Sequence, residues 1–185
     1  FIKLMHEISR ASKNLEKITI IEGSSKKDLY NILNQNFDEF HQLDYNEVIA
    51  DTYFFNYGIK FGDFEKLINK NFDKIKKLFK DNKLIEKFTF KEILIIGSLL
   101  EKEGLDYDDK KKIYSVIINR LNSKMKLQID ATVIYALTEN NNELRRKLNY
   151  NDLKIKHKFN TYYINGLPPE PISYVGLKTI ELIFE

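Results

Sequence analysis

The sequence predicts an α+β fold, in which a small strand-and-helix unit precedes a mainly helical domain with short strands. Three observations support this prediction. The β-branched run at residues 18–21 is followed by a turn and a short amphipathic segment, which is typical of a strand leading into a helix. Residues 63–84 and 108–122 carry apolar side chains at helical spacing. Residues 89–103 are apolar on almost every side, which predicts a buried helix.

The composition excludes several classes of protein. With 185 residues and 43% hydrophobic content, the chain can bury one good core or two small ones. A net charge of +3, from 30 basic and 27 acidic residues, gives no strong field of one sign, so nucleic acid is not an expected partner. There is no cysteine and there are three scattered histidines, so we expect no disulfide, no thiol chemistry, no metal and no cofactor.

The ends of the chain predict that it is a fragment of a longer protein. It begins with Phe1 and stops within an apolar stretch at residues 182–184. The longest apolar run, Ile93 to Leu100, is too short to span a bilayer. Any membrane anchor would therefore lie outside the fragment.

The first sixty residues predict the small unit and a connecting segment. Residues 1–17 have the spacing of a helix or an arm, and the strand at 18–21 leads to the turn at 22–25. Ser24 or Ser25 can cap a helix that ends near Phe37. Residues 38–58 are aromatic and irregular, and we expect a strand or extended segment across a core.

The helical domain, residues 61–185, contains three further kinds of segment after its long helices. Residues 124–129 predict an extended piece, and Asp130 is the expected N-cap of a brief helix that reaches Leu137. Residues 138–151 are polar and predict a surface loop or a charged helix. Gly166 to Pro169 predict a rigid shelf, because proline has a restricted φ and no N–H donor.

The buried helix ends in two acids, Glu101 and Glu103. Thr89 followed by Glu92 is a capping-box start, and side chains two positions apart diverge on a helix, so one acid, Glu101 by its apolar stripe, should point inward. A carboxyl group against apolar walls has a raised pKa and can donate a proton near neutral pH. Taken alone, the stretch fits two acids that only solvate a helix end better than it fits catalysis.

Four motifs in one order change that balance. They are Leu99 to Glu103, Val116 to Leu121, Met125 to Tyr135, and Phe159 to Tyr162 with Gly166 to Pro169. In this order they resemble the motifs of the endolytic murein transglycosylases, the MltG or YceG-like family. A weaker likeness at residues 18–23 and 51–58 extends the resemblance over nearly the whole chain, with departures at Ala50, Glu170 and Tyr174.

The resemblance implies a fold and an activity. It implies a LysM-like β/α subdomain and connecting segment at residues 1–60, and a YceG-like catalytic domain, incomplete at its C-terminal end, at residues 61–185. The family cleaves the β-1,4 bond between MurNAc and GlcNAc of nascent peptidoglycan strands. The first acid of its motif, Glu101 here, would protonate the glycosidic oxygen and then deprotonate the muramyl 6-hydroxyl, which forms a 1,6-anhydro ring. A hydrolase would need a second carboxylate, and Asp130 is the only other near candidate, so a single acid favours transglycosylation.

The same resemblance implies supporting residues that bind the substrate or position the acid. Amide and hydroxyl side chains would bind acetamido and hydroxyl groups, Tyr135 or Tyr162 would stack on a sugar or orient the acid, and Glu103 is the alternative to Glu101 as the acid that faces the substrate. The full set is Glu103, Asn119, Arg120, Gln128, Asp130, Thr132, Tyr135, Asn160, Thr161 and Tyr162.

The implied partners are peptidoglycan glycan strands, with cell-wall synthases as further candidates. The implied location is the cell membrane, with a single-pass anchor outside this fragment and this domain on the periplasmic side. An alternative is a non-catalytic peptidoglycan-binding module or scaffold, in which the acids only cap helices. A helical interaction protein also fits the composition, but it gives no reason for four ordered motifs.

Overall fold

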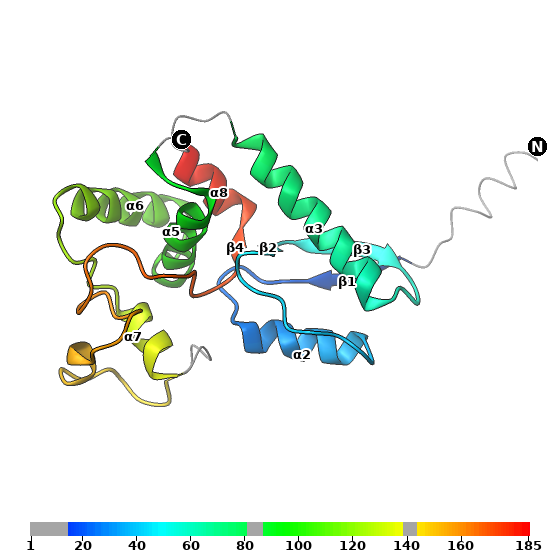
Figure 1. The fold of residues 1–185 in the computed structure, drawn as a ribbon, viewed down its shortest axis with the longest axis horizontal. Coiled ribbons are helices and arrows are strands. Elements are labelled where there is room, and N and C mark those ends of the chain that lie inside the picture. Colours follow the sequence, from blue (N-terminus) through cyan, green and yellow to red (C-terminus); the bar gives the residue numbers. More distant parts are fainter. Residues whose placement is uncertain (1–14, 81–86, 139–143) are drawn as a thin grey trace, which may run out of the picture.

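The computed structural model describes residues 15–80, 87–138 and 144–185, and their arrangement confirms the α+β prediction (Figure 1). Some predicted features lie outside the described residues. These are the helix or arm before residue 15, the end of the helix predicted at 63–84, and part of the segment predicted at 138–151.

The N-terminal unit is a two-stranded antiparallel ribbon with one helix. Strand β1 (Leu15–Thr19) pairs with β3 (Thr52–Asn56), and helix α2 (Lys26–Asn36) lies between them in sequence. The strand therefore begins three residues before the predicted run. The predicted cap is confirmed, because the Ser25 side chain accepts a hydrogen bond from the N–H of Asp28 at 3.2 Å and the Asp28 carboxylate accepts from the Ser25 N–H at 2.7 Å.

A second, parallel pairing joins a strand just before β3 to a strand near the C-terminal end of the chain. Strand β2 (Ile49–Ala50) pairs with β4 (Val175–Gly176), and helix α8 (Leu177–Phe184) follows directly. The sequence reading did not predict β4 or α8. A strand of two residues has no detectable periodicity, and its partner is too distant in sequence to be inferred from local pattern.

The helical domain is built around α5 (Phe90–Glu103). Its N-terminal capping box is confirmed, since Thr89 accepts from the N–H of Glu92 at 3.2 Å while the Glu92 carboxylate accepts from the N–H of Thr89 at 2.7 Å. Every residue from Ile93 to Leu100 is buried. The helix contacts α6 (Tyr107–Asn122), α8 and β4, which cover it on different sides (Figure 1).

Two small residues allow α5 to be buried this completely. Ser98 is fully buried, and its hydroxyl donates to the Ile95 carbonyl at 2.7 Å and accepts from the Ile172 N–H at 3.0 Å. Gly97 lies against Val175, where an added Cβ would be 2.6 Å from Val175 Cγ1. The helix and β4 therefore approach more closely than any larger residue would permit.

The remaining elements are α3 (Phe61–Leu78), α7 (Asp130–Leu137) and the 3-10 turn η1 (Asp152–Lys154). Helix α3 begins two residues before the predicted start and buries an apolar stripe against the N-terminal ribbon. The η1 turn is held by a bidentate pair between Arg146 and Asp152, at 2.6 and 2.8 Å. This pairing lowers the pKa of Asp152 to about 2.

We expect Gly97→Ala to lower the free energy of unfolding by about 1 to 2 kcal/mol, because overpacking against Val175 outweighs the gain in helix propensity. Chemical denaturation measures this change. Gly62→Ala in α3 is the matched control, since nothing lies within 4 Å of its added Cβ, and it should raise stability by about 0.5 to 1 kcal/mol. Equal shifts for both variants would contradict the close approach of α5 and β4.

Candidate functional site

The two acids of α5 point to different parts of the protein, as the helical geometry predicts. The Glu101 side chain is 2% exposed, and its Oε2 lies 2.5 Å from Nζ of Lys110 on α6. Its Oε1 accepts a hydrogen bond from the Gly176 N–H at 3.2 Å. The expectation of purely apolar walls around Glu101 is therefore wrong, because a buried ammonium group compensates its charge.

The surroundings of Glu101 form a junction between the N-terminal unit and the helical domain. Lys110 also donates to the Thr179 hydroxyl at 3.1 Å. Gly23 has a φ of +75°, and a Cβ there would be 3.3 Å from the Glu101 carbonyl oxygen, so both its conformation and its position favour glycine. Burial, and next the charge of Glu101, raises the pKa of Glu22. The contacts of Glu101 thus connect α5, α6, β4 and the turn after β1.

Glu103 lies on the other side, at the exposed end of α5. Its Oε1 accepts a hydrogen bond from the Ala131 N–H in the first turn of α7, at 3.3 Å. Partial burial of the carboxyl group raises the pKa of Glu103, and the negative charge of Asp130 raises it further, while the Ala131 N–H opposes the shift. Glu103 is therefore an accessible carboxyl group whose proton is retained to higher pH than usual.

Asp130 does not cap α7 as the sequence reading predicts. The N-cap residue is Ile129, and Asp130 is the first helical residue. Its Oδ1 accepts a hydrogen bond from the Tyr162 hydroxyl at 2.6 Å instead. Burial, and then this hydrogen bond to a carboxylate, raises the pKa of Tyr162 to about 12, so the phenol keeps its proton and holds Asp130 in place beside Glu103.

Two of the predicted ligand contacts, Gln128 in the segment before α7 and Asn119 on α6, are exposed to solvent. Gln128 has a φ of +54°, and its backbone N–H donates to the Thr161 carbonyl at 3.2 Å. Arg120 braces the same segment, because its Nη1 donates to the Leu127 carbonyl. The side chains of Gln128 and Asn119 are exposed and make no hydrogen bond with any described residue. Both remain candidates for contact with a ligand.

Three of the predicted residues form a buried polar network. Thr132 and Thr161 share a hydrogen bond of 2.9 Å between their hydroxyls, and Thr161 Oγ1 accepts from the Ile129 N–H at 2.8 Å. Asn160 donates to the carbonyls of Leu153 and Ile155 at 3.0 and 2.8 Å.

All three side chains are 0% exposed, which corrects the expectation that Asn160 and Thr161 hydrogen-bond the substrate directly. Their polar groups already have protein partners. Their role is to position the loop, which carries Tyr162, against α7.

Tyr135 also differs from its predicted role as a sugar platform. It is 4% exposed, and its ring lies 4.6 Å from that of Phe159 and 6.5 Å from that of Tyr45, between ring centroids. No open ring face remains for a sugar. The shelf at residues 166–169 also lies away from Glu103. It lines a cavity of about 660 Å³ at the start of α5, whereas Glu103 is at the end of that helix.

The structure thus gathers Glu103, Asp130, Tyr162 and the first turn of α7, with Arg120 behind them, and separates Glu101 from this group. Lys110, which pairs with Glu101, was missed in the sequence, because a lysine within a run of three reads as a solvated helix face. Among residues 15–80, 87–138 and 144–185, no group of three or more acidic or histidine side chains is arranged to hold a metal ion. None of the helices in these ranges is long and apolar enough to cross a membrane.

Comparison with known proteins identifies relatives over most of the chain. The YceG-like family profile matches residues 2–185. A region of 95 residues is 39% identical to the endolytic murein transglycosylase of Bacillus subtilis strain 168, covering 51% of this chain and 25% of that protein. A region of 105 residues is 35% identical to the endolytic murein transglycosylase of Streptococcus pneumoniae strain D39, covering 52% of this chain and 18% of that protein. The matched regions thus span a quarter or less of the curated relatives.

A solved structure has the same fold. The crystal structure of a yceG-like protein from Listeria monocytogenes superposes with a TM-score of 0.76, and the match covers 99% of this chain and 71% of that chain. The two sequences are 24% identical, so this likeness concerns the fold alone.

We expect Asp130→Asn to lower the pKa of Glu103, because it removes the negative charge that disfavours a second carboxylate nearby. Carbon-detected NMR titration of the Glu103 side chain measures this. Folding raises the pKa of Glu103. The stabilisation that its protonated carboxyl group gives to the folded state is therefore complete below the pKa of the unfolded state. It is lost as the pH rises through the pKa of the folded state. Asp63→Asn on α3 is the control, and an unchanged Glu103 titration in Asp130→Asn would rule out the coupling.

We expect Glu101→Gln to lower the free energy of unfolding by about 3 kcal/mol, because it removes the carboxylate that pairs directly with the largely buried ammonium group of Lys110. Adding Lys110→Met should recover part of the loss, since both charges are then removed. Denaturant unfolding of the single and double variants measures the coupling. Lys66→Met, which breaks an exposed pair with Asp63, should have no measurable effect.

Proposed function

Since this chain belongs to the YceG-like family, we propose that it is part of a lytic transglycosylase that cleaves the glycan strands of peptidoglycan. Two relatives, from different species, are named endolytic murein transglycosylases, which supports this substrate class. The observation that carries the proposal is the accessible carboxyl group of Glu103, whose pKa is raised beside the first turn of α7.

The surroundings of the two acids favour Glu103, and not Glu101, as the proposed general acid. A general acid must reach the glycosidic oxygen of a sugar, and the Glu101 side chain is 2% exposed and already bonded to Lys110 and Gly176. Glu103 is exposed, and its raised pKa favours the protonated form that the first step needs.

The proposed reaction balances with this one acid. Glu103 donates its proton to the oxygen between MurNAc and GlcNAc as the bond from that oxygen to the muramyl anomeric carbon breaks. The resulting carboxylate then takes the proton of the muramyl 6-hydroxyl. The oxygen of that hydroxyl bonds to the anomeric carbon at the same time. The products are a 1,6-anhydro-MurNAc end and a free GlcNAc 4-hydroxyl. No water is consumed, and Glu103 returns to its protonated state.

Asp130 would support this chemistry without reacting. Its carboxylate accepts a hydrogen bond from the Tyr162 hydroxyl, which holds it in place, and its negative charge contributes to the raised pKa of Glu103. A fixed negative charge near the anomeric carbon would also stabilise the positive charge that develops there in the transition state. Exposed Gln128 and Asn119 are the proposed contacts to acetamido or hydroxyl groups.

We also propose that the domain acts on the extracytoplasmic side of the cell membrane, together with cell-wall synthases. The support is chemical, because the proposed substrate is nascent peptidoglycan, which those synthases produce outside the membrane. Fluorescence imaging of the tagged full-length protein would test the location, and a signal confined to the cytoplasm would contradict it.

We expect Glu103→Gln in the full-length protein to reduce the formation of anhydro-muramyl ends from purified peptidoglycan by about a hundredfold or more, because the proton donor is removed. Mass spectrometry of the soluble products measures this. Glu101→Gln, assayed where it remains folded, should keep most of its turnover. Glu16→Gln on β1, another exposed glutamate, is the matched control.

Three outcomes would contradict the proposal. Normal amounts of anhydro ends from Glu103→Gln would remove this residue from the mechanism. Reducing ends from the wild-type protein would make it a hydrolase. Binding to sacculi without any soluble product would favour the non-catalytic peptidoglycan-binding module.

A further inference from the structure

A second polar cavity lies between the N-terminal unit and the C-terminal half of α7. Its volume is about 550 Å³, and polar and aromatic side chains from both parts of the chain line it. The residues that matter for its chemistry are Lys26, Asn46, Tyr135, Lys158 and Glu170. None of them contacts Glu103 or Glu101, so this cavity is separate from the acid at the end of α5.

Tyr135 presents an unpartnered hydroxyl group to this cavity. The residue is 4% exposed, yet its hydroxyl makes no hydrogen bond with any residue in the described ranges. Burial raises the pKa of Tyr135, with Tyr45, Asp44 and Glu170 adding to the shift, so the phenol keeps its proton and remains a donor. Among the described residues, the hydroxyl oxygen of Tyr135 is not one of the enclosed polar atoms without a partner, so it is open to the cavity and can donate to a ligand or to water.

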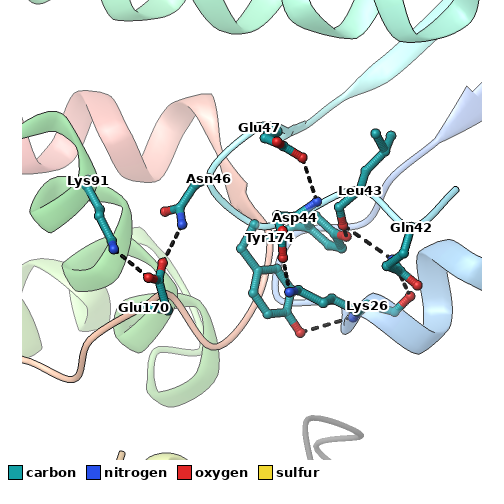
Figure 2. Close-up of polar contacts among 10 residues, drawn as sticks. Lys26, Gln42, Leu43, Asp44, Asn46, Glu47, Lys91, Glu170 and Tyr174 are labelled. Atoms are coloured by element: carbon teal, nitrogen blue, oxygen red, sulfur yellow. Dashed lines mark hydrogen bonds and ion pairs between the residues drawn. The ribbon is translucent and has the colours of Figure 1, made fainter. Parts of the chain in front are cut away.

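Asn46 also lines the cavity, and its amide oxygen is an enclosed acceptor without a partner among the described residues. Figure 2 shows Glu170 between Lys91 and Asn46, with the Lys91 ammonium group 2.5 Å from Glu170 Oε1. Asn46 Nδ2 donates to the other carboxylate oxygen, and because a carboxylate only accepts, the amide oxygen must point away from it. That oxygen, Asn46 Oδ1, is buried and has no hydrogen-bond partner among the described residues.

Cationic side chains stand at the rim of the cavity. Lys26 is paired with Asp44 (Figure 2). Its Nζ also lies 5.1 Å from the centroid of the Tyr45 ring. Lys158 is exposed, its Nζ lies 5.7 Å from the Phe159 ring centroid, and it forms no ion pair with a described residue. The rim therefore offers one uncompensated positive charge.

We propose that this cavity binds a short peptide with a free carboxylate. A peptide complements the walls, since its carbonyl oxygen accepts from the Tyr135 hydroxyl and its carboxylate pairs with Lys158. A sugar fits less well, because stacking needs an open ring face, and Tyr45, Tyr135 and Phe159 are 2%, 4% and 6% exposed.

Under the proposed function, which this assignment builds on, the peptide is the side chain carried by the muramyl residues of the glycan substrate. Helix α7 connects the two sites, because Asp130 begins it beside Glu103 and Tyr135 lies five positions later in the cavity wall. At about 1.5 Å per residue, this separation is about 7.5 Å along the helix axis. Five positions also turn the helix by about 140°, so a peptide attached to a sugar at Glu103 would run around α7 to enter the cavity.

Isothermal titration of the full-length protein with the tetrapeptide Ala–Glu–Lys–Ala, with a free C-terminal carboxylate, tests the peptide site independently of any enzymatic activity. We expect binding that weakens about fivefold in Tyr135→Phe and at least as much in Lys158→Met, because one hydrogen bond or one ion pair is lost in each. The same peptide with a C-terminal amide should bind the wild type as weakly as the acid binds Lys158→Met.

Tyr57→Phe is the matched control, since that tyrosine is exposed and lies outside the cavity. Tyr135→Phe keeps the ring that packs against Phe159, and thermal unfolding verifies that it remains folded. Absence of peptide binding to the wild type, or equal binding by all variants, would overturn the peptide site. Peptide binding by a protein that forms no anhydro ends would overturn the proposed function and leave the peptide site standing.

Discussion

Burial of α5 on every side is the constraint on which the rest of the structure depends. From Ile93 to Leu100 the helix has no solvent face, because α6, α8 and β4 cover it together with α7. The absence of a side chain at Gly97 lets Val175 approach the helix closely, and the Ser98 hydroxyl is hydrogen-bonded within the core. The charged side chains of the helix therefore stand only at its ends, and the elements that bury it also surround its terminal acids.

Those elements give the two acids opposite electrostatic surroundings. The carboxylate of Glu101 meets the ammonium group of Lys110 and a backbone N–H, and the buried pair connects three elements. Glu103 meets the first turn of α7 with the negative charge of Asp130 close by, and it stays accessible to solvent. Two chemically identical groups thus receive a structural and a proposed catalytic role, because Glu101 is enclosed in an ion pair, whereas partial burial raises the pKa of the accessible Glu103.

Local features of the fold were predictable where neighbouring residues provide the stabilising contacts. The helix cap at Ser24 or Ser25, the capping box at Thr89 and the course of α6 were predicted from spacings within one or two turns, and the structure has the first of these at Ser25. The pairing of β2 with β4 was not predictable, because its two strands are short and distant in the chain. Asp130 was misread as a cap, since its real partner is the Tyr162 hydroxyl, 32 positions later.

The sequence by itself determined the α+β class, the buried helix, its two diverging acids and the ordered motifs that mark the family. The apolar stripe also predicted that Glu101 points inward, and its 2% exposed side chain confirms this. Only the tertiary structure decided which groups each acid meets. Helical spacing sets the angle between Glu101 and Glu103, but it carries no information about the side chains that meet them. Those partners come from positions 9, 28 and 75 residues away, and folding alone brings them to the two carboxylates.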